Sequence, residues 1–304
     1  MSNRPETLAP VGDHTAFCAG IRSVYQILVQ AGFVSADEIV WPEQQTTEQH
    51  DLLRSGPLPP EMLSLVKQLP FPSPIVHEEL LRIHSDRLNN FMGLMIAPSS
   101  GAVCYLYKDE LTDCRNAFEA GLAESELTET AFKITNYGNQ EGSMWLYDLA
   151  TKKITEQPYN HSPDQPLQGP ADQILATWLS NLRTLAWLPW RFETARYIET
   201  RPTKHDYCLR EGADSLTEPD AELAAAELNH FNARRKIYID CGWPDYFDPQ
   251  RFQAAQSSWN QEYRDICEEA EDDDLNDLVT NPLNLNDNPD LIAFVARSAW
   301  DLAV

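Results

Sequence analysis

Apolar residues in the first part of the chain recur every three or four positions in separate stretches, which is the spacing of amphipathic helices. Gly32 follows the first stretch, and Thr15 stands where it could cap its start. Prolines open the second stretch, as they often do in the first turn of a helix. The predicted helices are Ala16–Ala31, a second beginning at Pro59-Pro60-Glu61, and Ile75–Ile83, with a polar loop around Pro42 to Glu48.

Between residues 91 and 157 the pattern changes to short runs rich in β-branched and aromatic residues, separated by turn formers. Neighbouring runs joined by short turns form hairpins, so the sheet is predicted to be mostly antiparallel. Helices come before and after these runs, which favours an α+β fold with an antiparallel sheet flanked by helices. The predicted strands are Phe91–Ile96, Ala102–Tyr107, Ala131–Thr135, Met144–Leu149 and Lys153–Gln157.

Helical spacing returns after residue 167. Pro189 is expected to end the first helix of this part, and a boundary near Trp190 divides the chain. We therefore predict an α+β core over residues 12–190 and a mainly helical C-terminal portion over 191–304 that packs on it. The predicted elements are a helix over Ala171–Trp187, a strand within Arg191–Thr200, and helices over Glu218–Ile239, Pro249–Ala270 and Pro289–Leu302.

The chain is strongly acidic, with 47 acidic and 23 basic residues in 304 and a formal charge of −24. This balance disfavours a nucleic-acid-binding surface spread over the whole molecule, which needs a basic field. Its N-terminus has no apolar signal segment, its longest apolar stretch is too polar to cross a membrane, and its six cysteines form no CxxC pair. We expect a cytoplasmic protein without membrane contact and with reduced thiols.

One local sequence is distinctive: a Gly/Asn-rich turn from Tyr137 feeds the aromatic strand Ser143–Leu149, and a second turn headed by Asp148 leads to a return strand. Together with the Leu58-Pro59-Pro60 helix opening and the Trp178-Leu179 helix, this segment resembles the SUKH superfamily of fungal cell-wall-synthesis regulators and toxin-immunity proteins. The resemblance covers about residues 55–185. It implies a non-catalytic binding module built on a curved sheet flanked by helices. Trp145, Tyr147 and Asp148 are the binding candidates in this segment.

Histidines and carboxylates offer candidates for a different, catalytic interpretation. His77 and His84 are seven residues apart, which does not match the four-residue spacing of an H-E-x-x-H zinc site, so we expect a partly exposed helix face and no metal. No glycine-rich phosphate loop, dinucleotide fingerprint or nucleophile elbow is present in the sequence, and we expect no cofactor. The catalytic candidates are His77, His84, His205, His230, Asp245 and Asp248.

The segment Gly242–Asp248 combines aromatic residues with turn formers between two predicted helices. Asp248 followed by Pro249 is a typical helix start. We expect Trp243 and Phe247 to pin this turn to the core. Trp243 and Tyr246 are also binding candidates, and the turn is a candidate pocket wall.

Charge is concentrated at two places in the C-terminal part. Arg234-Arg235-Lys236 is the compact basic cluster, either the cationic end of a helix or a local contact for phosphate or RNA. The run Glu262–Asp277 holds nine acidic residues and one arginine. It lacks the glycine and glutamate that a calcium loop requires. We expect the preceding helix to end near Ala270 and Glu271–Asn288 to form an exposed acidic loop.

The sequence thus favours a non-catalytic cytoplasmic binding or regulatory protein whose acidic surface contacts a protein partner, with a basic partner favoured. The alternative is a cofactor-independent enzyme of small-molecule metabolism with its pocket between the core and the helical tail.

Overall fold

A computed structural model of the chain describes residues 13–85, 94–114, 130–137, 142–158, 167–192, 196–201 and 218–269. Three expectations lie outside them: the acidic loop over 271–288, the helix over 289–302 and His205. The N-terminal half of the predicted strand Phe91–Ile96 also lies outside.

The fold is α+β, as predicted, and every described strand pair is antiparallel. The helices are α1 (Thr15–Gln30), η1 (Ala36–Glu38), η2 (Pro42–Gln44), α2 (Thr47–Ser55), α3 (Pro60–Val66), α4 (Pro74–Ser85), α5 (Lys108–Asp113), α6 (Ala171–Arg183), α8 (Glu218–Asp240) and α9 (Pro249–Glu269). The strands are β1 (Ile39–Val40), β2 (Phe71–Pro72), β3 (Met95–Ala97), β4 (Ser100–Ala102), β5 (Ala131–Lys133), β6 (Thr135–Tyr137), β7 (Ser143–Asp148), β8 (Lys153–Pro158), β9 (Gln168–Pro170), β10 (Trp187–Arg191) and β11 (Arg196–Thr200).

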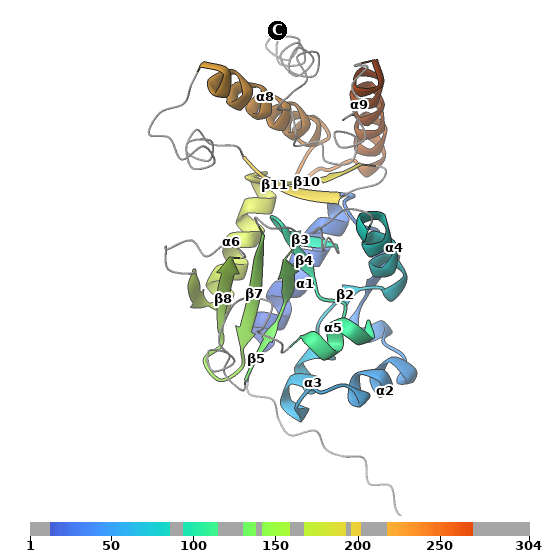
Figure 1. Cartoon of the computed structure of the whole chain (residues 1–304), viewed down its shortest axis with the longest axis vertical. Coiled ribbons are helices and arrows are strands. Elements are labelled where there is room, and N and C mark those ends of the chain that lie inside the picture. The colour runs from blue at the N-terminus through green and yellow to red at the C-terminus, as the bar shows by residue number, and fades with distance from the viewer. Residues whose placement is uncertain are drawn as a thin grey trace, which may run out of the picture.

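The central strands form two hydrogen-bonded groups, β3-β4-β6 and β5-β7-β8-β9. Ile134, between β5 and β6, joins the groups, because its N–H donates to the carbonyl oxygen of Trp145 (2.8 Å) and its own carbonyl accepts from Val103 (3.2 Å). The N–H of Trp145 also donates to Thr135 Oγ1 at 3.0 Å. Ile134 therefore joins the two groups into one antiparallel layer. Figure 1 shows strands β4, β5, β7 and β8 of this layer beside α1 and α6.

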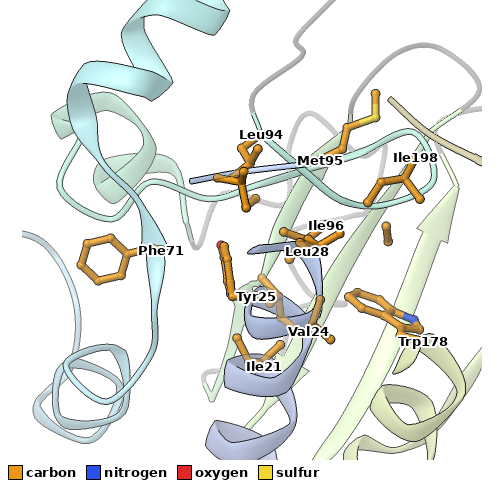
Figure 2. Packing of buried hydrophobic residues seen from close by; sticks show 14 of the residues in the cluster. Ile21, Val24, Tyr25, Leu28, Phe71, Leu94, Met95, Ile96, Trp178 and Ile198 are labelled. Carbon is orange, nitrogen blue, oxygen red and sulfur yellow. The ribbon is translucent and has the colours of Figure 1, made fainter. Parts of the chain in front are cut away.

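Helices α1 and α6 pack against each other and against this layer (Figure 1). A Cβ on Gly20 of α1 would lie 2.7 Å from Leu175 Cδ1 of α6, so the absence of a side chain at Gly20 permits the close approach. Figure 2 shows the centre of the core, where Val24 and Leu28 of α1 face Ile96 of β3. One buried cluster extends from Phe17 to Tyr263 and includes residues of α6, β10, α8 and α9.

Most predicted helices are confirmed, but the ends of two segments differ from expectation. Helix α1 begins after His14, and Thr15 is its first residue, not its cap. The loop predicted over Pro42–Glu48 instead contains η2 and the start of α2. Thr46 caps α2 through its side chain, which accepts from the N–H of Gln49 (3.3 Å). In turn, the side-chain Oε1 of Gln49 accepts from the N–H of Thr46 (2.9 Å). This capping box gives the short helix its start.

One strand prediction and one helix prediction are wrong in extent. The strand expected over Ala102–Tyr107 stops at Ala102, and the chain then turns into α5. The helix expected to reach Trp187 ends at Arg183, because the backbone of Leu185 enters the left-handed region (φ 56°) and redirects the chain. Pro189 therefore lies within β10, opposite Ile198 of β11, where it does not end a helix.

The hairpin β10–β11 connects the sheet and helices α1 and α6 to the C-terminal helices α8 and α9 (Figure 1). Tyr238 of α8 donates its hydroxyl hydrogen to the carbonyl oxygen of Pro189 (2.5 Å), and the carbonyl oxygen of Ala31 lies 3.2 Å from the same hydroxyl. Trp190 Nε1 donates to Asn260 Oδ1 of α9 at 3.0 Å. The boundary near Trp190 stays a prediction, and on its C-terminal side the helical portion packs on this hairpin.

Within the described ranges, we find no helix that combines the length and the apolar character needed to cross a bilayer.

Candidate functional site

The aromatic strand β7 directs two of its three binding candidates into the core. Trp145 is 6 % exposed and meets Trp178 edge to face, with ring centroids 4.9 Å apart. Tyr147 is 1 % exposed and stacks on Phe17 at 3.7 Å. The geometry therefore does not support the sequence interpretation of Trp145 and Tyr147 as partner contacts, because a binding residue needs an accessible side chain.

The hydroxyl of Tyr147 lies 2.6 Å from Nδ1 of His14, a pair that the sequence did not reveal. Burial raises the pKa of Tyr147, and burial also lowers the pKa of His14, so both groups are uncharged at neutral pH. A hydrogen bond between two neutral, buried groups fixes the start of α1 against the sheet.

Asp148 heads the turn between β7 and β8, as predicted. Its Oδ1 accepts from the N–H of Ala150 (2.8 Å), the N–H of Thr151 (3.4 Å) and the hydroxyl of Thr130 (2.7 Å). Because the Asp148 carboxylate accepts from these three donors, it stabilises the turn. This structural role explains the aspartate without any bound ligand.

His77 is fully buried, in contrast to the partly exposed helix face that its spacing from His84 suggested. Its Nε2 lies 3.3 Å from Glu110 Oε1 of α5, although neither ring nitrogen makes a hydrogen bond. Glu110 also accepts from the N–H of Cys104 (2.5 Å) and from Asn136 Nδ2 (2.7 Å). The group joins α4, α5 and β6. Burial, with a smaller contribution from Glu110, raises the pKa of Cys104 to about 12, so its thiol is not a nucleophile at neutral pH.

His230 occupies an aromatic site between α8 and α9, far along the chain from His77. Its ring stacks on Trp259 (4.7 Å between centroids) and on Tyr263 (5.4 Å), and its Nε2 makes no hydrogen bond. Burial lowers the pKa of His230 well below its usual value, and the charge of Arg234 lowers it further. His230 is therefore a neutral packing residue.

The three residues of the basic cluster Arg234-Arg235-Lys236 have separate roles. Arg234 is 2 % exposed and holds Glu199 of β11 through two bonds of 2.5 Å each. Its guanidinium also lies over the rings of Trp190 (5.6 Å) and Trp259 (5.5 Å). Arg235 donates to a backbone carbonyl of Thr184, and Lys236 pairs with Asp240. The cluster does not lie in the last turn of α8, and the Arg234 guanidinium is not accessible to a phosphate.

The α8–α9 turn, residues Cys241–Asp248, is the one sequence candidate that combines fixed geometry with an exposed aromatic side chain within the described residues. Trp243 is buried and donates through Nε1 to the carbonyl oxygen of Arg183 (3.0 Å). Asp248 accepts from the N–H groups of Gln250 and Arg251, each at 3.1 Å, and thereby caps α9 as predicted. Tyr246 points to solvent and is 89 % exposed.

Of the remaining catalytic candidates, Asp245 is the one whose side chain the structure describes. His84 lies in α4, and His205 lies outside the described residues. Asp245 is exposed at the α8–α9 turn. Among the residues that the structure describes, no three metal-ligating side chains come together. No sequence pattern indicates a role for Glu110 or Glu199, because only the fold brings their partners to them.

Comparison of the chain with protein-family models, with curated proteins and with solved structures finds no match.

Proposed function

We propose that this chain is a non-catalytic binding protein of the SUKH type, which contacts a basic protein partner through its acidic surface. The observation that carries the proposal is the arrangement of the central part. An antiparallel layer joined at Ile134 has α1 and α6 packed together against it. The resemblance of residues 55–185 to the SUKH superfamily implies a curved sheet with flanking helices, and the antiparallel layer with its two helices supports that expectation. The family assignment is part of the proposal.

The net charge of −24 supports the choice of partner. A surface of this charge attracts basic proteins and speeds their association, and the attraction falls as salt screens it. Binding to a basic partner is therefore expected to depend strongly on ionic strength.

The candidate catalytic groups favour binding over the enzyme alternative, because each one that is described has a structural partner or lies alone. His77 packs beside Glu110, His230 packs on Trp259, and Asp248 caps α9. General acid–base catalysis requires such groups to meet around a substrate. Untargeted metabolite profiling after deletion of the gene tests the alternative, and accumulation of one substrate-like compound would favour it.

The test of the proposal is affinity capture from the native host over a series of salt concentrations, followed by titration with the purified partner. We expect a basic protein whose affinity falls as salt rises. Failure to recover any partner with this salt dependence contradicts the proposal.

A further inference from the structure

Tyr246 is the most exposed large apolar residue among the described ones, at 89 %, and it stands in the middle of the α8–α9 turn. Ile239, in the last turn of α8, is 50 % exposed. Tyrosine is enriched at the energetically important centres of protein interfaces, because its ring supplies contact area and its hydroxyl supplies a hydrogen bond. A tyrosine this exposed gains little from the fold of its own chain, so a contact with another molecule is a reason for its position.

The turn holds Tyr246 in one place. The N–H of Tyr246 donates to the carbonyl oxygen of Gly242 (2.9 Å), and the N–H of Asp248 donates to that of Cys241 (2.8 Å). From α1, Gln30 Nε2 donates to the carbonyl oxygen of Pro244 at 2.7 Å. Phe247, next in sequence, packs against the core cluster. A side chain presented on a fixed backbone loses little conformational freedom on binding, which favours affinity.

The charge around the turn selects the partner. Between Ile237 and Gln250 the chain has three aspartates and no basic residue. Asp240 pairs with Lys236 and Asp248 caps α9, whereas Asp245, the residue before Tyr246 in the sequence, is exposed. Arg251 follows in the first turn of α9. With the chain's formal charge of −24, the exposed Asp245 carboxylate attracts a basic ligand to this turn.

We infer that Tyr246 and Asp245 form the contact surface for an arginine-containing segment of the protein partner, an inference that rests on the proposed function. Arginine fits this pair better than lysine, because its planar guanidinium stacks on an aromatic face and also makes directed hydrogen bonds to a carboxylate. The stack uses the Tyr246 ring, and the ion pair uses the Asp245 carboxylate.

Fluorescence anisotropy with labelled peptides tests the inference. The probes are a short peptide of alternating arginine and glycine, its lysine counterpart and its glutamate counterpart. We expect the arginine peptide to bind more tightly than the lysine peptide and the glutamate peptide not to bind. Tyr246→Ala is expected to weaken binding of the arginine peptide by about tenfold or more. Asp245→Asn weakens it by a smaller factor, and Asp245→Arg abolishes it.

Two matched variants control for general effects. Leu52→Ala removes an exposed apolar side chain from α2, and Asp109→Asn removes an exposed charge from α5. Both are expected to bind the arginine peptide like the unmodified protein. Thermal unfolding curves of all variants confirm that the fold is intact, which is expected because Tyr246 and Asp245 are exposed.

The outcomes separate this inference from the proposed function. If Tyr246→Ala binds the arginine peptide and the captured partner as tightly as the unmodified protein, the contact surface lies elsewhere and the inference is wrong, while the proposed function stands. If the unmodified protein binds neither a basic peptide nor a basic partner, both are wrong.

Discussion

Glu199 and Arg234 are two charged residues that the fold removes almost completely from water, at 7 % and 2 % exposure. Their two-bond geometry and the neighbouring Trp190 and Trp259 rings compensate for the lost hydration of the guanidinium. The pair also joins β11 to α8. Removal of one partner of such a buried pair strongly destabilises the fold, because the other charge then remains buried and uncompensated.

Glu199→Gln is therefore expected to lower the free energy of unfolding by about 3–5 kcal/mol, measured by chemical denaturation. The control is Asp51→Asn, which breaks the exposed pair with Arg54 and should cost less than about 1 kcal/mol. Equal, small losses in the two variants would show that Arg234 reaches solvent when its partner is removed.

His230 gives a pH dependence with a defined sign. Its pKa is depressed in the folded protein, whereas in the unfolded chain it is near 6.5, so below this pH the unfolded state binds more protons. The contribution of His230 to stability is fully present above about pH 6.5 and is lost as pH falls below that value, by at most about 1.4 kcal/mol per pH unit. His230→Phe should make the unfolding midpoint less sensitive to pH between about 6.5 and 5. An unchanged pH dependence contradicts the assignment of this residue as a neutral buried group.

At the scale of elements, the sequence correctly predicts the helices and strands whose local signals are strong. The spacing of Val24 and Leu28 identified α1, and Asp248 before Pro249 identified the start of α9. Where tertiary contacts decide, it did not. Trp187 continued a helical apolar pattern, yet it belongs to β10, because Leu185 redirects the chain and β11 offers a pairing edge. Arg234 looked like part of an exposed cluster, since its carboxylate partner lies 35 residues earlier in the chain.

Gly242 sets the geometry of the α8–α9 turn. Its φ is +87°, and a Cβ there would overlap the carbonyl oxygen of Tyr246. Gly242→Ala should therefore lower the melting temperature, with a loss of more than about 1 kcal/mol. Gly169→Ala serves as the control, because its Cβ would meet Ile174 at an ordinary distance of 3.6 Å and its φ is not positive. Similar stability of the two variants would mean that the turn can adopt another conformation.

At the scale of the whole molecule, acidic residues outnumber basic ones by two to one, and their mutual repulsion opposes the compact state. Added salt screens this repulsion over a Debye length that shortens from about 30 Å at 0.01 M to about 8 Å at 0.15 M. We expect the melting temperature to rise over this range, as measured by scanning calorimetry. A fall would mean that attractive surface pairs, such as that between Arg22 and Glu43, outweigh the repulsion.

The position of Tyr238 has a consequence for how the molecule opens. Its hydroxyl lies between the end of α1 and strand β10, so α8 cannot separate from the sheet without exposing three elements at once. Amide protons at Phe33 and Glu199, which lie in these neighbouring parts of the chain, should therefore exchange with deuterium in a single cooperative event. Tyr238→Phe removes the shared hydroxyl, and the two amides are then expected to exchange at different rates.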